Sequence, residues 1–292
     1  VALDNLFTGQ RSNIAHLAAE PRFRFVEGDV CDAHLVDELT RGCDVVFHLA
    51  AVVGVKHVID NPLAGMRTNV LGTANVLAAA HRHGVRVCLA SSSEVYGQSE
   101  DVPFVEDGPR VLGPTWIPRW SYATAKALDE HLCFAYRDRG LEVSVVRYFN
   151  AYGPRTDSRG YGSVVARFVN QALSGEPLTV HGDGQQTRSF TYVSDSVEGT
   201  IRAGTMPAAL GEAFNLGSEE EITVERLARE IIALTGSRST LTYLPYEAAF
   251  GAHFAEPRRR VPNAGKARRL IGFEPQVSLQ DGLRRTIEWF RG

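Results

Sequence analysis

Residues 45–90 read VVFHLAAVVGVKHVIDNPLAGMRTNVLGTANVLAAAHRHGVRVCLA, and this stretch decides the fold. Its two ends, residues 45–49 and 85–90, are short apolar runs of strand length, whereas residues 61–83 have the length and apolar spacing of a helix. Asn61 is predicted as the N-cap of that helix, because Pro62 then takes the first helical position. A strand, a helix and a second strand in this order predict two parallel strands of one sheet.

The same alternation continues on both sides of this stretch. Strands are predicted at residues 22–26 and 143–147, and helices at about 33–41 and 121–138. Apolar strands between helices indicate a sheet covered on both faces, so the chain is predicted to be α/β with a doubly wound parallel sheet.

Beyond about residue 153 the alternation loosens, which indicates a smaller α+β lobe. Helices are predicted there near residues 163–174, 195–203, 223–234, 264–271 and 279–290. We therefore predict two domains, 1–153 and 154–292, with segments near 189–217 returning to the first.

Composition and charge exclude several classes of protein. A formal net charge of -3 and a pI near 6.3 give no reason to expect nucleic acid or an anionic membrane as a partner. No apolar run approaches the ~20 residues that span a bilayer. The four cysteines lack a C-x-x-C pair and metal-type spacing with histidine, so we expect no metal site and a reducing, cytoplasmic setting: Cys31, Cys43, Cys88 and Cys133.

Tyr122 and Lys126 form a Tyr-x-x-x-Lys pair. The chain has nine tyrosines but only three lysines, so about 0.1 such pairs are expected by chance, and the spacing is worth following. Residues four apart share one face of a helix, where the ammonium can favour the ionised phenol. The pair predicts a tyrosine that acts as a base near neutral pH, with Lys126 also able to reach a ribose hydroxyl.

Residues that follow the predicted strands are candidates for a dinucleotide site, because ligands of such sheets bind at the carboxyl ends of the strands. Asp4 is placed to accept hydrogen bonds from the adenosine ribose, and a carboxylate there favours NAD over NADP. Asp29 follows the next strand, and small residues after His48 let a cofactor approach the backbone. The predicted cofactor-binding residues are Asp4, Asn5, Asp29, Val30, Leu49, Ala50, Ala51, Tyr122 and Lys126.

The serines that end the strand at residues 85–90 are candidates for substrate contact. The Ser92 hydroxyl can bond the substrate oxygen that Tyr122 deprotonates, although serines also satisfy backbone groups in turns. Glu94 offers a second acid–base group for proton transfer at another carbon. With Tyr122 and Lys126, the predicted catalytic set includes Ser92, Ser93 and Glu94.

Six motifs follow one another along the chain: Asp4-Asn5-Leu-Phe-Thr-Gly9, Gly28-Asp29-Val30, His48-Leu-Ala-Ala51, Ser92-Ser-Glu-Val-Tyr-Gly97, Tyr122-x-x-x-Lys126 and Arg147-Tyr-Phe-Asn150-Ala-Tyr-Gly-Pro-Arg155. In this order they resemble the extended short-chain dehydrogenase/reductases, and among these the branch of nucleotide-sugar epimerases, dehydratases and decarboxylases. The resemblance covers nearly the whole chain and implies a Rossmann-like NAD-binding domain with a lobe for the sugar nucleotide.

The resemblance also implies roles for individual residues. Tyr122 takes the proton of the sugar C4 hydroxyl as hydride passes to NAD, Lys126 holds the nicotinamide ribose, and Ser92 orders the C4 oxygen, which gives a transient 4-keto sugar. The substrate-binding residues that it implies are Arg119, Asn150, Arg188, Arg258 and Arg260, with Arg259 as a further clamp. Guanidinium groups suit a pyrophosphate or a carboxylate.

Three outcomes compete within this branch. Dehydratases of the dTDP-glucose type carry Asp-Glu where this chain has Ser93-Glu94, so dehydration is disfavoured. Three features resemble UDP-glucuronate decarboxylases: the Ser-Glu pair, the Arg-Arg-Arg-x-Pro run and Pro118-Arg119-Trp120. This resemblance implies that Glu94 and Ser93 act near the carboxylate of the substrate. It also implies that Arg119 or Arg260 binds that carboxylate. A 4-epimerase acting on UDP-glucose or UDP-glucuronate is the alternative.

One expected motif is missing. The sequence contains no G-x-x-G-x-x-G loop, on which pyrophosphate binding at a helix N-terminus depends. We expect that an upstream strand, loop and helix precede Val1, and the other interpretation is a non-catalytic dinucleotide-binding relative. By analogy with the family, we also expect a homodimer formed through the helices at residues 61–83 and 121–138.

Overall fold

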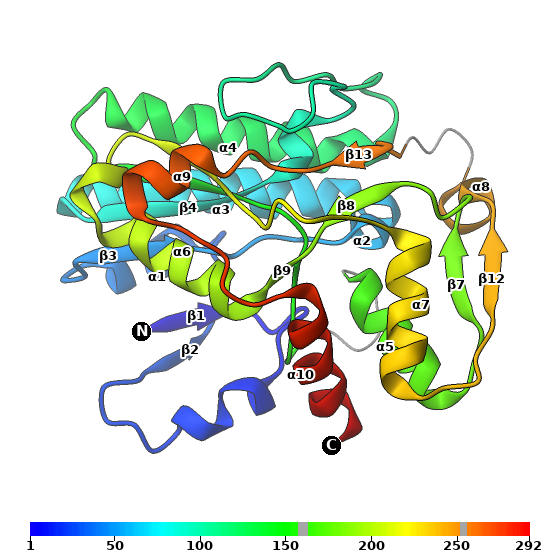
Figure 1. Cartoon of the computed structure of the whole chain (residues 1–292). Coiled ribbons are helices and arrows are strands. Elements are labelled where there is room, and N and C mark those ends of the chain that lie inside the picture. The colour runs from blue at the N-terminus through cyan, green and yellow to red at the C-terminus, as the bar shows by residue number, and fades with distance from the viewer. Residues whose placement is uncertain (157–162, 252–255) are drawn as a thin grey trace.

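The structure, a computed structural model, describes residues 1–156, 163–251 and 256–292. Figure 1 shows a central sheet between two layers of helices and, beside it, a smaller lobe that ends in the C-terminal helix. The sheet has four parallel strands in the order β10-β5-β4-β3, whose bounds are β3 (Val45–His48), β4 (Arg86–Ser92), β5 (Val143–Tyr148) and β10 (Ala213–Leu216). The predicted α/β class with a parallel sheet is confirmed.

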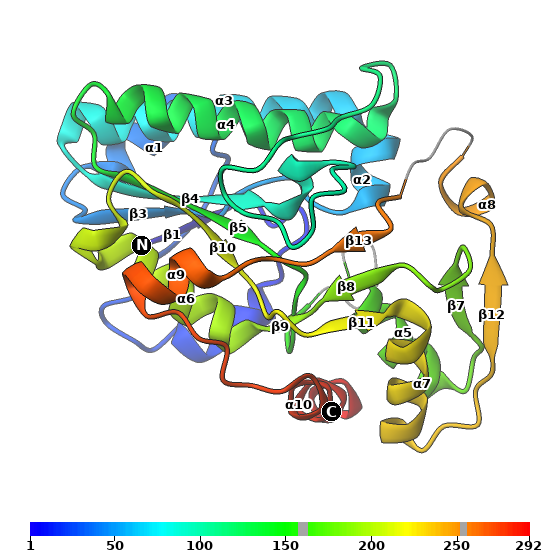
Figure 2. The same cartoon turned by 45° about the horizontal axis from the view of Figure 1, so that its top comes forward.

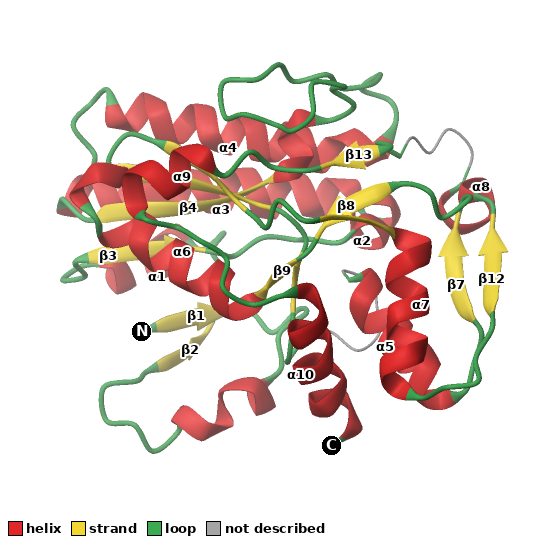
Figure 3. Ribbon diagram, viewed as in Figure 1, coloured by secondary structure: helices red, strands yellow, loops and turns green. Residues whose placement is uncertain are grey.

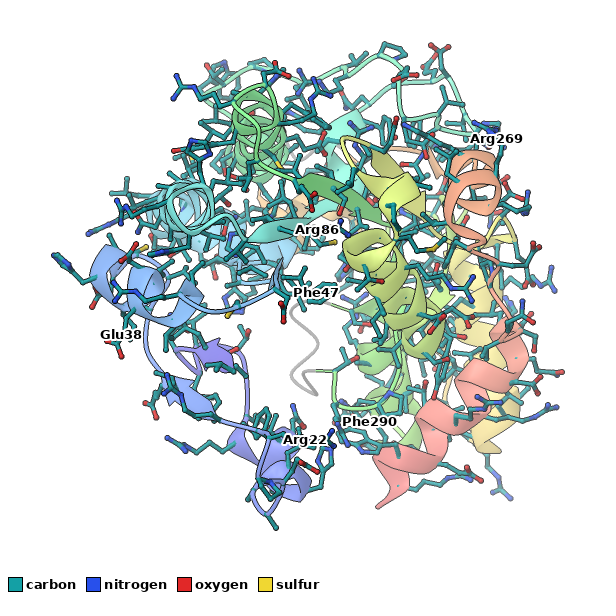
Figure 4. The ribbon with its side chains drawn as sticks, turned by 90° about the vertical axis from the view of Figure 1, so that its left-hand side faces the viewer. Arg22, Glu38, Phe47, Arg86, Arg269 and Phe290 are labelled. Atoms are coloured by element: carbon teal, nitrogen blue, oxygen red, sulfur yellow. The ribbon has the colours of Figure 1, made fainter. Side chains whose placement is uncertain are left out.

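Two further parallel strands form a separate small sheet. β1 (Ala2–Asp4) pairs with β2 (Phe25–Glu27), and neither pairs with β3. A trough of about 730 Å³ runs between β1 and β3, and residues of both strands line it. Phe47, labelled in Figure 4, reaches from β3 to the helix on the other side, where Gly204 leaves room for its ring.

Helices cover both faces of the main sheet (Figure 2). One face carries α1 (Ala33–Thr40), α3 (Pro62–His83) and α4 (Ser121–Arg137), and the other carries α6 (Val193–Thr205) and α9 (Gly265–Ile271). α3 begins as predicted, because the Asn61 side chain accepts a hydrogen bond from the Ala64 amide and Pro62 takes the first position. It ends at Gly84, whose left-handed backbone suits glycine.

The smaller lobe has its own apolar core. Figure 3 shows its two-stranded sheet, β7 (Leu178–His181) with β12 (Leu241–Leu244), standing apart from the central sheet. Buried Phe168, Leu227 and Leu283 belong to this core. They come from α5 (Val164–Ser174), α7 (Val224–Thr235) and α10 (Leu279–Arg291), and α8 (Tyr246–Phe250) lies beyond β12.

Short strands connect the lobe to the main sheet. β8 (Thr187–Ser189) pairs antiparallel with β11 (Glu221–Thr223) and parallel with β13 (Arg259–Arg260), while β6 (Ala151–Tyr152) pairs with β9 (Thr191–Tyr192). Because β8 and β13 are neighbours, Arg188 and Arg260 are paired in register. Two arginines from distant parts of the sequence are therefore held side by side.

The observed elements differ from the predicted ones mostly at their ends. The helices predicted at 33–41, 61–83 and 121–138 are α1, α3 and α4, and the strand predicted at 22–26 lies later, at Phe25–Glu27. Helix α2 (Val55–Asp60) and the 3₁₀ helix at Arg11–Leu17 were not predicted. β10 and α6 lie with the main sheet, and so does α9, while the division into domains at residue 153 remains a prediction.

Candidate active site

The end of β4 and the 3₁₀ helix η2 (Ser93–Tyr96) carry the predicted serines and Glu94. The Ser92 hydroxyl accepts a hydrogen bond of 3.2 Å from the Glu94 amide and so starts η2. The buried Tyr96 fixes the other end of η2, because its hydroxyl accepts from Arg147 at 2.8 Å and donates to Asn215 at 2.7 Å. The turn that carries the site is therefore bonded to β5 and β10.

α4 brings Tyr122 and Lys126 to the same cavity. Both side chains line a cavity, together with Ala90 and Ser91 from β4. The cavity has a volume of about 490 Å³, which falls within the size range of small-molecule sites. Lys126 is only 2 % exposed, and its Nζ donates to the Ala90 carbonyl at 2.9 Å. Both side chains therefore face the same cavity.

Lys126 does not lower the pKa of Tyr122 as expected, which corrects the prediction of an acidic phenol. Burial raises the pKa of Tyr122, the negative charge of Glu94 raises it further, and the hydrogen bond with Ser92 lowers it. The ammonium of Lys126 faces Asp129 instead, with 3.5 Å between Nζ and Oδ2. Its charge is thus compensated before it can favour the ionised phenol.

Five charged side chains form what we call the Arg–Glu cluster. The Glu94 carboxylate accepts hydrogen bonds from Arg119 at 2.6 and 3.2 Å and from Arg260 at 2.6 Å. Glu256 bonds Arg188 and lies 3.8 Å from Arg119. The cluster therefore consists of Glu94, Arg119, Arg188, Glu256 and Arg260, all buried or nearly so.

The cluster fixes the charge of Glu94. Burial alone would raise the pKa of this carboxyl, but the guanidinium groups of Arg119 and Arg260 hold it well below its usual range. Glu94 is therefore an ionised anchor for two arginines in the ligand-free protein. A group that exchanges protons near neutral pH needs a pKa near 7, and two neighbouring guanidinium groups move the pKa of Glu94 in the opposite direction.

Arg260 keeps donors available beside this anchor. Only its Nη1 bonds Glu94, while its buried Nε and Nη2 have no hydrogen-bond partner among the residues that the structure describes. Buried guanidinium nitrogens without partners are costly, so these donors are suited to an incoming anion.

The other predicted arginines and Asn150 lie elsewhere. The side chain of Arg258 is 70 % exposed and pairs with Asp183, and Arg259 pairs with Glu221, so neither belongs to the cluster. Asn150 follows β5 with a left-handed backbone and donates to the Ser189 carbonyl at 2.8 Å. This bond places Asn150 next to the strand that carries Arg188.

Most of the predicted cofactor residues lie at the carboxyl ends of parallel strands. Asp4 ends β1 and Asn5 follows it, Asp29 and Val30 follow β2, and Leu49, Ala50 and Ala51 follow β3. Asn5 donates a hydrogen bond of 3.1 Å to Asp29. Leu49 and Ala51 also line the cavity that holds Tyr122 and Lys126. Carboxylates at the ends of β1 and β2 and a Tyr/Lys pair in this cavity suit the two ends of a dinucleotide.

Sequence reasoning missed Glu256 and Asp129. Glu256 directly precedes Pro257 and the three arginines, and an acid beside such a run was the available signal. Asp129 lies three residues after Lys126, a spacing that places both on one helix face.

Two searches of the described residues returned nothing. Residues 1–156, 163–251 and 256–292 contain no group of three or more metal-ligating side chains. No helix within these ranges is both long enough and apolar enough to cross a bilayer.

Comparison with known proteins identifies the family. The family described as GDP-mannose 4,6 dehydratase matches residues 2–286. The chain belongs to the extended short-chain dehydrogenase/reductases that act on nucleotide sugars. This family uses NAD, and the carboxylates at the ends of β1 and β2 and the Tyr122/Lys126 pair fit that cofactor.

Its relatives within the family include decarboxylases. The chain is 42 % identical over 289 residues to a UDP-N-acetyl-alpha-D-glucosaminuronate decarboxylase from Bacillus cytotoxicus, covering 99 % of this chain and 89 % of that protein. It is 40 % identical to UDP-glucuronic acid decarboxylase 1 from Danio rerio, but spans only 66 % of that longer protein and 99 % of its own length. A UDP-glucuronic acid 4-epimerase from Bacillus cereus, solved with UDP-glucuronic acid and NAD, is 29 % identical with a TM-score of 0.87, over 99 % of this chain and 90 % of that one.

Proposed function

We propose that this protein decarboxylates a UDP-uronate, most closely UDP-glucuronate, through transient oxidation at C4. The observation that carries the proposal is the composition of the Arg–Glu cluster, with three guanidinium groups and two carboxylates. Within the cluster, Arg260 keeps two buried nitrogens, Nε and Nη2, that have no hydrogen-bond partner among the described residues, and such donors are costly to bury. A carboxylate at C6 of the sugar supplies a charged acceptor for these nitrogens, whereas the C6 hydroxyl of UDP-glucose does not.

Arg260 is the proposed partner of that carboxylate. Glu94 holds its Nη1, and the buried Nε and Nη2 remain as donors for the two carboxylate oxygens. Glu94 is connected to the base through Ser92, which bonds both the Glu94 amide and the Tyr122 phenol. A sugar with its C4 hydroxyl at Tyr122 therefore has its C6 group on the side of the cluster. Asn150 and Arg188 remain the proposed contacts of the diphosphate.

The chemistry follows from this placement. When bound, NAD accepts the hydride from C4 and later returns it. The ionised form of Tyr122 takes the proton of the C4 hydroxyl, Ser92 orders the C4 oxygen and Lys126 holds the ribose. The C6 carboxylate then belongs to a β-keto acid, which loses CO₂ and leaves an enolate that is protonated at C5. The donors of Arg260 orient the carboxylate, and the apolar cavity wall favours its loss as uncharged CO₂.

The test is product analysis. The purified protein is incubated with NAD and either UDP-glucuronate or UDP-N-acetylglucosaminuronate, since a relative is named for each of these sugars. We expect release of CO₂ and formation of a UDP-pentose or its 4-keto form, detected by mass spectrometry. No gas release from either uronate would contradict the proposal.

A 4-epimerase acting on UDP-glucuronate is the second candidate. The support for it is the likeness to the Bacillus cereus 4-epimerase, whose substrate carries the same carboxylate. Conversion of UDP-glucuronate to UDP-galacturonate without CO₂ would establish this activity. A 4,6-dehydratase is disfavoured by Ser93, and a non-catalytic dinucleotide-binding protein would leave added nucleotide sugar unchanged.

We also propose that two copies of the chain pair through α3 and α4. Leu63, which is 75 % exposed, lies with Met66 and Leu71 on the exposed surface of α3, and Leu128 is exposed on the adjoining α4. Apolar side chains on two adjoining helices support a packed interface with a second copy.

A cytoplasmic setting is proposed as well. All four cysteines are free thiols, and Cys88 and Cys133 are fully buried in the core, as in proteins of reducing compartments.

A further inference from the structure

Asp129 is a buried carboxylate that the proposed reaction does not use. It lies on α4, three residues after Lys126, and is 0 % exposed. Its Oδ2 is 3.5 Å from Lys126 Nζ, and the Thr73 hydroxyl also faces the carboxylate. Lys126 is the cation that balances its charge. A buried carboxylate balanced by one ammonium requires an explanation, because it costs desolvation free energy that a neutral side chain would not.

The neighbouring carboxylate is already engaged. Glu130 accepts hydrogen bonds of 2.9 and 2.6 Å from Arg147 and a further bond from Ser91. It is therefore neutralised by a different cation, which leaves Asp129 as the carboxylate that balances Lys126. The two adjacent acids of α4 thus balance different cations: Glu130 pairs with Arg147 of β5, and Asp129 pairs with Lys126 at the cavity.

We infer that Asp129 is a positioning residue that keeps Lys126 charged and directed toward Ala90 and the cavity, and that loss of the Asp129 charge releases this hold. Lys126 is fixed from two sides, by the Ala90 carbonyl at 2.9 Å and by Asp129. Without the carboxylate, an ammonium that is 2 % exposed would favour its neutral form. The inference concerns the ribose-binding lysine and stands whichever nucleotide sugar is the substrate.

The burial of Asp129 makes its ion pair with Lys126 depend on pH. Burial raises the pKa of Asp129 to about 6, although Lys126 opposes the shift. Burial lowers the pKa of Lys126, and Asp129 opposes that change. The titratable and charged groups that face the pair are Glu130 and Cys133 on α4, Arg147 on β5, and, behind Thr73 of α3, His48 of β3, whose Nε2 lies 3.0 Å from the Thr73 hydroxyl.

Two of these neighbours are excluded as the source of a change near pH 6. Burial lowers the pKa of His48 to about 3, so this imidazole is neutral across the relevant range. Burial raises the pKa of the Cys133 thiol, which keeps it protonated. A change in Lys126 near pH 6 that Asp129→Asn removes therefore reports on Asp129.

The scarcity of lysine makes the test direct. With only Lys56, Lys126 and Lys266 in the chain, protein labelled with ¹³C at the lysine ε carbon gives three side-chain signals from this sequence, and Lys126→Met assigns the relevant one. In Asp129→Asn we expect the titration midpoint of Lys126 to fall by about 1 to 3 pH units, while the other two signals stay in place. Asp138→Asn, at the exposed end of the same helix, is the matched control and should change none of them.

A functional measurement separates positioning from a purely structural role. Asp129→Asn should move the alkaline limb of the kcat profile to lower pH by a similar amount and remove an acid limb near pH 6, and Asp129→Glu should restore both. A lowered kcat with an unchanged pH profile, or an unchanged Lys126 titration in Asp129→Asn, would overturn the inference.

The unmodified protein supplies a test if Asp129→Asn does not fold. Its Lys126 signal should show a second inflection near pH 6 that Lys56 and Lys266 lack, and a flat Lys126 signal through that range contradicts the inference. Because these spectra need no turnover, they can support the role of Asp129 even if UDP-uronates prove not to be substrates.

Discussion

Glu94 and Arg260 are 166 residues apart in the sequence, yet Arg260 Nη1 donates to Glu94 Oε1 at 2.6 Å. One residue follows the end of a central strand, and the other lies on a short strand beside the smaller lobe. Their bond joins distant parts of the sequence in one site, because it holds a guanidinium from the C-terminal region beside η2. The position of the two Arg260 nitrogens that lack a partner in the described ranges is thus set by a carboxylate, and we propose that these nitrogens, rather than Glu94, contact the sugar.

Replacing Arg260 should remove the proposed hydrogen bonds to the substrate carboxylate. We expect Arg260→Met to lower kcat for UDP-glucuronate by about 10²- to 10³-fold, as for loss of one preorganised donor in other active sites. Arg258→Met is the matched control, because Arg258 pairs with Asp183 at the surface. Steady-state CO₂ release measures both, and equal losses in the two variants would contradict the role given to Arg260.

Replacing Glu94 should cost stability as well as activity. Glu94→Gln leaves two buried guanidinium groups without their carboxylate, so we expect the free energy of unfolding to fall by about 3 to 5 kcal/mol. The pKa of Glu94 is lower in the folded than in the unfolded chain, so its contribution is complete above about pH 4.3 and is lost as pH falls toward the folded value. Denaturant melts should therefore show a gap between the two proteins that is constant near neutral pH and narrows below about pH 4.

The Tyr122 phenol should resist ionisation in the ligand-free protein. Since burial raises its pKa above the usual value, the tyrosinate absorbance that Tyr122→Phe removes should appear only above about pH 10. The same variant should retain its fold and lose at least about 10²-fold in turnover. A difference spectrum that develops near pH 8 would instead mean that Lys126 does make the phenol acidic.

The proposed pairing of two copies is tested by a charge on the exposed helices. Leu128→Glu should convert the dimer to a monomer in light scattering after size-exclusion chromatography, because it buries an unpaired carboxylate at the interface. Trp289→Glu, on α10 at the far side of the molecule in Figure 2, should leave the mass unchanged. A wild-type protein that is already monomeric would refute the proposal outright.

Local sequence signals predicted most of the fold. Apolar runs and the Asn61–Pro62 cap specify where strands and helices lie, since these signals act over a few residues. The positions of Ser92 and Glu94 after a strand and of Tyr122 and Lys126 on a helix followed from the same reasoning. Helix α2 was missed because its six residues are too few to show a clear helical period.

The pairing of charges could not be predicted in the same way. Which arginine of the run at 258–260 faces inward depends on the register of β13 against β8, and that register is a tertiary property. The compensation of Lys126 by Asp129 likewise depends on how deeply α4 is buried. The expected acidic phenol was wrong for this reason, because helix spacing brings two residues together but does not determine the charge around them.

The pairing of β13 with β8 has a consequence for which insertions the chain can accept. β13 is only two residues long, and its register places Arg260 opposite Arg188. Because successive side chains of a strand point to opposite faces, a shift of β13 by one residue would turn Arg260 away from Glu94. The segment before β13 can therefore change in sequence more freely than in length.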